Sequence, residues 1–120
     1  MVTLFQINFY EKENGKIPVK DFLLDLDLKM RAKALKEIEI LQRFGIDRME
    51  HHVKYMQDCI VDLRIKSGNN ISRIFYFFFT KENIILTNGF IKKTQKTPKK
   101  ELEKAVEYKI DYIRRFENEI

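Results

Sequence analysis

Three apolar runs separated by short polar turns lie between Ile60 and Lys96, and they constrain the fold more than any other stretch. The runs are Ile60–Ile65, Ile71–Phe79 and Ile84–Ile91. They are rich in β-branched and aromatic residues and are bounded by Gly, Asn and Ser, which is typical of consecutive β-hairpins. The stretch therefore predicts three antiparallel strands.

The lengths of the two turns decide how these strands pair. The first turn can hold two residues, Gly68-Asn69, or four, and the second turn can hold two, Lys81-Glu82, or four. All of these even lengths give the same register. The predicted pairs are Arg64–Arg73, Lys66–Ile71, Arg73–Phe90 and Ile71–Lys92. A turn of odd length would shift the pairing by one residue and move the side chains to the other face of the sheet.

In this register the two faces of the sheet differ in chemistry. One face holds most of the cations of the stretch, together with three uncharged residues. Its members are Arg64, Lys66, Arg73 and Lys92, with Phe75, Asn88 and Phe90. The other face is apolar and is predicted to be core: Val61, Leu63, Ile65, Ile74, Tyr76, Phe78, Ile85 and Ile91. Two arginines directly across a strand pair repel each other, and a chain tolerates this most readily where an anion binds between them. We interpret the first face as a surface for a phosphate backbone.

The whole chain has the size and composition of one globular domain, residues 1–120, with 44% hydrophobic and 34% charged residues. The net charge of +5 favours a polyanionic partner, although an acidic protein would satisfy the same charge. The only cysteine, Cys59, excludes an internal disulfide and is expected to be a buried thiol in a reducing compartment. Without a signal peptide or a long apolar run, the protein is expected in the cytoplasm, away from membranes.

The flanking segments predict one more strand and three helices. Val2–Tyr10 alternates apolar and polar residues, as a half-buried strand does. Helical spacing of apolar residues predicts a hairpin of two helices, Pro18–Leu28 and Lys29–Phe44, with Asp27 as a cap. A last helix starts at Pro98. The predicted order is β-α-α-β-β-β-α, an α+β fold with a small antiparallel sheet packed against the helical hairpin and the C-terminal helix.

The second helix of the hairpin is expected to divide into an inner and an outer face. The inner stripe is apolar: Met30, Ala34, Leu35, Ile38, Leu41 and Phe44. The outer face is interpreted as a solvated surface of mixed charge: Lys29, Arg31, Lys33, Lys36, Glu37 and Glu39.

The segment 46–58 lacks clear periodicity and is expected to be a loop. It contains two adjacent histidines, His51 and His52, but no Cys, Asp or Glu set at ligand spacing accompanies them, so no metal site is predicted. A histidine could still serve in acid–base chemistry at a cationic site.

A set of motifs runs from the strands into the last helix. They are Asp62-Leu63-Arg64, Ser72-Arg73-Ile74-Phe75-Tyr76, the string from Asn88-Gly89-Phe90 to Lys96-Thr97-Pro98, and Glu103, Ala105 and Tyr112 in the helix that follows. With these motifs the chain resembles the RelE/ParE superfamily of toxins from bacterial toxin–antitoxin pairs, and within it the HigB-like, phage-related branch. The resemblance covers nearly the whole chain. Asp62 stands where such proteins often have Glu.

The resemblance implies a RelE-like fold and an mRNA endonuclease without a cofactor, commonly acting on messages in the ribosomal A site. It also implies a tightly bound antitoxin, usually a HigA-like helix-turn-helix protein. The complex, expected as a heterotetramer, would reach operator DNA only through the antitoxin.

RNA cleavage without a metal uses the 2′-OH as nucleophile and needs a base, an acid and charge stabilisation at phosphorus. Arg73, with Arg64 beside it, is expected to stabilise the transition state, and Arg73→Ala to abolish cutting without unfolding the chain. A lysine crowded by cations loses its proton more readily, so Lys92 or Lys66 could act as base or acid. The residues expected to bind RNA or the ribosome are Phe90, Lys93, Lys96 and Lys54.

Other interpretations stay open. The two arginines could pair in a surface network without function, with Asp62, Glu82 or Glu101. The protein could be a non-enzymatic inhibitor of a target such as DNA gyrase, as ParE-type relatives are. It could also be a phage-derived interaction module without toxicity.

Overall fold

The computed structural model describes residues 5–45, 53–55, 59–93 and 98–117. The elements are β1 (Gln6–Phe9), α1 (Pro18–Asp25), α2 (Leu28–Phe44), β2 (Val53–Tyr55), β3 (Val61–Ser67), β4 (Asn70–Phe78), β5 (Asn83–Lys92) and α3 (Lys99–Phe116). The α+β class is confirmed, as is each predicted helix and strand. The short strand β2 is an addition, because it lies in the segment that was expected to be a loop.

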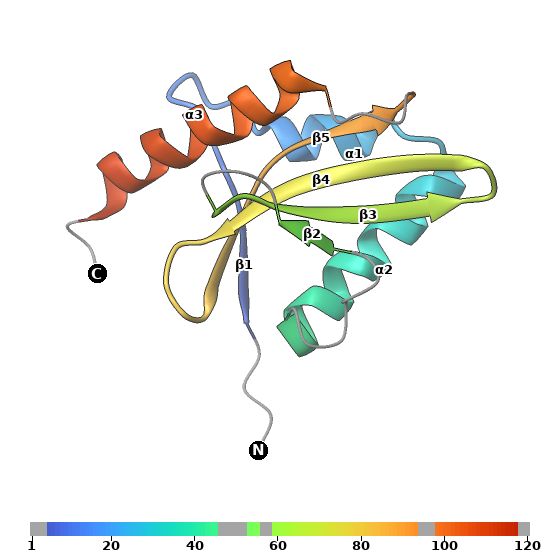
Figure 1. Cartoon of the computed structure of the whole chain (residues 1–120), viewed down its shortest axis with the longest axis horizontal. Coiled ribbons are helices and arrows are strands. Elements are labelled where there is room, and N and C mark those ends of the chain that lie inside the picture. The colour runs from blue at the N-terminus through green and yellow to red at the C-terminus, as the bar shows by residue number, and fades with distance from the viewer. Residues whose placement is uncertain (1–4, 46–52, 56–58, 94–97, 118–120) are drawn as a thin grey trace.

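The five strands form one mixed sheet in the order β1-β5-β4-β3-β2 (Figure 1). The pairs from β2 to β5 are antiparallel, whereas β1 runs parallel to β5. The prediction of an antiparallel sheet was therefore wrong for β1. No turn fixes the direction of this strand, because two helices rather than a hairpin follow it in the chain.

The predicted register of the hairpins is confirmed at the cationic end of the sheet. The observed pairs include Arg64–Arg73, Lys66–Ile71, Arg73–Phe90 and Ile71–Lys92. Ser67 pairs with Asn70, so the first turn holds two residues. Gly68 in this turn has a φ of 61°, a left-handed conformation that glycine adopts without a steric penalty.

The second turn is odd in length, and a β-bulge compensates for it. The amide of Phe79 donates to the carbonyl of Asn83 at 2.8 Å, which leaves three residues between them. Further along, Phe75 pairs with Asn88 but Tyr76 pairs with Leu86, so the residue between them, Thr87, has no partner in the ladder. The shift made by the turn is cancelled at this bulge, and the cationic end regains the predicted register.

Because of the bulge, part of the observed core differs from the predicted core. Ile85 was assigned to the apolar face together with Leu63 and Ile74, but it lies on the opposite face beside Phe77. Two other assigned core residues, Phe78 and Ile91, lie toward the ends of their strands and are 37% and 50% exposed.

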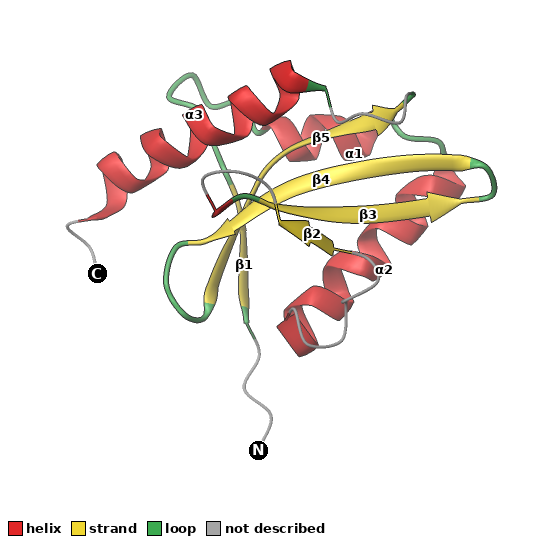
Figure 2. Cartoon of the chain, in the orientation of Figure 1, coloured by secondary structure: helices red, strands yellow, loops and turns green. Residues whose placement is uncertain are grey.

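Helices cover both faces of the sheet, so the structure has three layers (Figure 2). The α1–α2 hairpin packs on one face over an aliphatic core that includes Val19, Leu23, Met30, Leu63 and Ile74. α3 packs on the other face over a largely aromatic core that includes Tyr10, Phe75, Phe77, Phe90 and Tyr112. The described helices include none that is long and apolar enough to cross a membrane.

The predicted cap of α2 is confirmed, whereas α1 ends at Asp25 instead of Leu28 and α3 starts at Lys99 with Pro98 as its N-cap. The side chain of Asp27 caps α2 by accepting the amide of Met30 at 2.8 Å. Leu35 and Phe44, however, were assigned to the inner stripe of this helix and are 50% and 40% exposed. Cys59 was expected to be buried and is exposed, because it precedes β3 in a left-handed conformation with a φ of 61°.

Candidate functional site

The cationic residues of β3, β4 and β5 lie in adjacent rows across the face of the sheet that α3 partly covers. The first row is Arg64–Arg73–Phe90, and the next row toward the first turn is Lys66–Ile71–Lys92. On the other side of the first row lies Lys54–Asp62–Phe75–Asn88. Directly opposite residues of antiparallel strands have Cβ atoms about 4.5–5.5 Å apart, so the two arginines are close neighbours. We call Arg64, Arg73, Lys66 and Lys92 the cationic site.

Arg73 lies almost entirely inside the protein and contacts a buried carboxylate. The residue is 8% exposed, and its Nη1 lies 3.2 Å from Oδ2 of Asp62, which is 0% exposed. A carboxylate buried to this extent needs a counter-ion, because an unpaired buried charge is costly. The pairing of Arg73 with Asp62 is thus real, but it is buried and not part of a surface network.

The two facing arginines keep unused hydrogen-bond donors. The Nε atoms of Arg64 and Arg73 are both buried and have no hydrogen-bond partner in the described part of the chain. Arg64 is half-buried, and it has no ion pair with any residue that the structure describes. Buried N–H groups usually have an acceptor, and here two such donors belong to arginines that face each other across a strand pair. A phosphate oxygen suits a guanidinium, whose planar fork matches phosphate geometry.

The lysines proposed for the site differ in exposure. Lys66 and Lys93 are exposed, and Lys92 is half-buried. Lys54 is described only through its backbone, which pairs with that of Asp62. Lys96 lies outside the described residues, as do the two histidines of the segment 46–58.

Phe90 lies in the core under α3 and is not an exposed platform. It is 8% exposed, and its ring centroid lies 5.3 Å from that of Phe75 at an angle of 50°. A ring covered in this way does not offer its face to a base. The expectation that Phe90 stacks on RNA is therefore corrected, because α3 covers this position of the sheet.

Asn88 links the edge of the site to the first turn of α3. Its Nδ2 donates to the backbone carbonyl and to Oε2 of Glu101, both at 3.1 Å. The hydroxyl of Thr87 lies 2.8 Å from Oδ1 of Asn88. The bulge residue and its neighbour thus hold α3 against β5.

Asp62 and Asn88 border the cationic site but were not among the predicted site residues, although Asp62 was considered as a surface partner of the arginines. The two-residue alternation of a strand was a signal for Asp62, since positions 62 and 64 must share a face. No comparable signal marked the contact of Asn88 with Glu101, which depends on where α3 docks.

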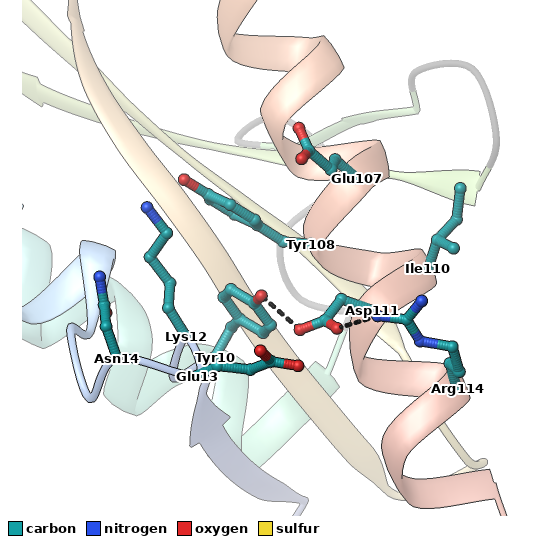
Figure 3. Close-up of a pocket in the computed structure, with 9 residues that line it drawn as sticks. All are labelled: Tyr10, Lys12, Glu13, Asn14, Glu107, Tyr108, Ile110, Asp111 and Arg114. Carbon is teal, nitrogen blue, oxygen red and sulfur yellow. Dashed lines mark hydrogen bonds and ion pairs between the residues drawn. The ribbon is translucent and has the colours of Figure 1, made fainter.

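A second charged cluster joins the C-terminal half of α3 to residues that follow β1 (Figure 3). The carboxylate of Asp111 accepts hydrogen bonds from the hydroxyl of Tyr10 at 2.6 Å and from Arg114 at 2.8 Å. Nη2 of Arg115 lies 2.8 Å from the same carboxylate and donates to the carbonyl of Glu11 at 2.6 Å. This Asp111 cluster borders a cleft of about 510 Å³.

The Asp111 cluster favours one protonation state. Burial, and then the hydrogen bond to Asp111, raises the pKa of Tyr10 to about 12. The hydrogen bond from Tyr10, followed by those from the arginines, lowers the pKa of Asp111. Tyr10 therefore stays neutral and Asp111 stays ionised across the physiological pH range, and we interpret the cluster as a structural link between α3 and the sheet.

These features define a small basic α+β protein whose sheet carries a cationic face. The model of the phage-derived Gp49-like protein family matches residues 21–109, which are 89 of the 120 residues. The chain therefore belongs to that family, a RelE/toxin-like family whose members are commonly toxins of toxin–antitoxin systems. Membership implies an antitoxin as partner. A search of curated proteins finds no match to the chain.

Proposed function

We propose that the protein is the toxin of a type II toxin–antitoxin pair and that it cleaves mRNA, as HigB-like mRNA interferases with a RelE-like fold do. The observation that carries this proposal is the facing pair Arg64–Arg73, whose buried Nε donors lack acceptors in the described structure. Two guanidinium groups side by side suit the oxygens of a phosphate that gains charge in a transition state.

In the proposed reaction the 2′-oxygen of the RNA attacks the neighbouring phosphorus and the bond to the 5′-oxygen breaks. A base takes the proton of the 2′-OH, and an acid gives a proton to the leaving 5′-oxygen. The products are a 2′,3′-cyclic phosphate and a free 5′-OH, so no metal or cofactor is required.

Each residue of the cationic site has a proposed role in this step. Arg73, held by Asp62, and Arg64 stabilise the charge on the non-bridging oxygens. Lys92 and Lys66, in the next row, are the candidates for the two proton transfers. The RNA backbone on either side is bound by basic residues around the site: Lys93, Lys96 and Lys54.

The substrate is proposed to be mRNA on the ribosome, which places the activity in the cytoplasm. We also propose that the antitoxin is a HigA-like helix-turn-helix protein that forms a heterotetramer with the toxin and contacts operator DNA. What supports this part is membership of a toxin-like family.

A matched pair of variants tests the proposed cleavage. Arg64→Gln removes a cation that has no ion pair among the described residues, whereas Arg43→Gln removes an exposed cation of α2 that pairs with Glu39. Cleavage of a translated mRNA is followed by primer extension, with and without ribosomes. We expect Arg64→Gln to slow cleavage about 100-fold or more and Arg43→Gln to leave it unchanged. Intact mRNA with the wild-type protein, or equal rates for both variants, would sink the proposal.

The buried Asp62–Arg73 pair also favours a second function. It neutralises Arg73 inside the fold, as a structural ion pair would in a non-enzymatic inhibitor of a target such as DNA gyrase. Expression of the protein alone distinguishes the two functions. Growth arrest with intact mRNA and a DNA-damage response would favour the inhibitor.

A further inference from the structure

The helical hairpin carries an apolar stripe that faces solvent. On α2, Leu28, Ala32 and Leu35 recur at the i, i+4 and i+7 spacing that puts residues on one side of a helix. Leu28 is 78% exposed and Leu35 is 50% exposed, and Ala32 is exposed as well. Leu24, in the last turn of α1, is 58% exposed. Single exposed leucines are ordinary, whereas several together often mark an interaction site.

A row of lysines runs beside this stripe. Lys29, Lys33 and Lys36 have the same spacing displaced by one residue, and all three are exposed. Within the described residues none of them has an ion pair or hydrogen bond. Like charges three and four residues apart weaken a helix, and Lys29 lies in the first turn, where the helix dipole disfavours a cation. The three lysines therefore do not stabilise α2.

We propose that the face of α2 formed by Leu28, Ala32, Leu35, Lys29, Lys33 and Lys36, called the leucine–lysine face, binds an amphipathic helix of a partner protein whose apolar stripe is flanked by Asp or Glu. The apolar stripe would pack against the leucines, and the carboxylates would pair with the three lysines. The family implies an antitoxin, and we expect this helix in that protein. The inference rests on the toxin–antitoxin part of the proposed function and is independent of RNA cleavage.

The position of the face has a consequence for the complex. α2 belongs to the helical layer on the side of the sheet opposite to that of Arg73 and Phe90. A helix bound to the leucine–lysine face would therefore leave the cationic site uncovered. The occupied face and the cationic site can then be probed separately.

A second copy of the chain is the main competing occupant. α3 presents the exposed residues Glu103, Glu107 and Ile110, the last of them 60% exposed. These residues could complement the lysines of another molecule. Such a contact joins two different surfaces, so it would appear as self-association that grows with concentration.

The test uses a designed helical peptide of about 20 residues, with leucines at i, i+4 and i+7 and glutamates beside them. Its binding to the full-length protein is measured by fluorescence anisotropy. We expect binding that weakens about 10-fold or more in Lys33→Glu and that is lost in the double variant Leu28→Ser/Leu35→Ser. A peptide with lysines in place of the glutamates should bind Lys33→Glu better than it binds the wild type. Lys100→Glu, at an exposed position of α3, should bind like the wild type.

The outcomes that overturn the inference are specific. No binding, or equal binding to the wild type, Lys33→Glu and the leucine double variant, contradicts it. Self-association that is lost in Lys33→Glu and restored when Glu107→Lys is added would assign the face to a second copy. Circular dichroism confirms that each variant is folded. Cleavage that persists without peptide binding contradicts this inference alone, and peptide binding without cleavage contradicts only the proposed enzymatic activity.

Discussion

Two clusters of arginine and carboxylate side chains differ in how their charges are paired. In the Asp111 cluster, the guanidinium groups of Arg114 and Arg115 each lie 2.8 Å from a carboxylate oxygen of Asp111. In the cationic site Arg73 has Asp62 at 3.2 Å, but Arg64 has no carboxylate in the described part of the structure. Both clusters contain a buried Nε that has no hydrogen-bond partner among the described residues, so this property alone does not separate them. What separates them is a second arginine, Arg64, which faces the first and has no counter-ion among those residues.

This difference indicates what each cluster does. The Asp111 cluster satisfies its own charges and fastens α3 to the residues after β1. The cationic site has more positive than negative charge on a half-buried surface, and a bound phosphate would balance it. The first cluster is therefore expected to matter for stability alone, and the second for stability and function.

The largest effect on stability is expected from Arg73→Ala. The substitution leaves the charge of Asp62 buried without its cation, which lowers the free energy of unfolding by about 3–5 kcal/mol. This outcome differs from the expectation, drawn from the sequence, that Arg73→Ala spares the fold. Urea unfolding followed by circular dichroism measures the change.

A double variant separates the lost ion pair from other effects of Arg73. Asp62→Asn/Arg73→Gln removes both charges and should recover most of the lost stability, because neither partner is left charged. It should remain inactive in RNA cleavage. A single Arg73→Ala variant as stable as the wild type would contradict the buried ion pair.

A smaller effect is expected at the Asp111 cluster. Tyr10→Phe removes the hydroxyl that donates to Asp111 at 2.6 Å, which should lower the free energy of unfolding by about 1.5–3 kcal/mol. Tyr108→Phe is the matched control, because Tyr108 stacks on Tyr10 but its hydroxyl has no hydrogen bond to any described residue. Cleavage should be unchanged in both. Equal destabilisation by the two variants would argue against the role of the Tyr10 hydroxyl.

The smallest and most specific effect expected from the Asp111 cluster is the dependence of stability on pH. The folded state raises the pKa of Tyr10 from 10.0 to about 12. The stability that this shift contributes is therefore fully present below pH 10 and is lost as the pH rises through 12. The pKa of Asp111 is lowered from 3.8, so its contribution is present above that pH and is lost as the pH falls through the folded pKa. Absorbance of tyrosinate should show that one late-titrating tyrosine of the wild type is missing in Tyr10→Phe. The same number of late-titrating tyrosines in Tyr10→Phe as in the wild type would contradict the assignment.

The sequence predicts the hairpins and the register of the cationic site, although part of that success is a cancellation. The turn after β4 has an odd length that the sequence does not reveal, and the bulge at Thr87 reverses its effect. A bulge of this kind depends on the contacts of its residue, here of Thr87 and Asn88 with Phe75 and with α3. The face of Ile85 was mispredicted for the same reason.

The sequence could suggest the pairing of Arg73 with Asp62, since local alternation in β3 and the hairpin register bring them together. It could not suggest the Asp111 cluster, because Tyr10 and Asp111 are 101 residues apart and meet only when α3 docks. The parallel direction of β1 and the exposure of Leu35 likewise depend on how helices pack, which periodicity alone does not determine.

The two clusters are expected to differ in their affinity for phosphate, and NMR of the arginine Nε–H groups measures this difference. Arg64, Arg73 and Arg115 each have a buried Nε without a hydrogen-bond partner in the part of the chain that the structure describes. Their signals can be followed together during titration with a short RNA methylated at its 2′-oxygens, which cannot be cleaved. We expect large shifts for Arg64 and Arg73 that saturate together, and no shift for Arg115. Shifts confined to Arg115, or no shift at Arg64 and Arg73 while the RNA binds elsewhere, would contradict this expectation.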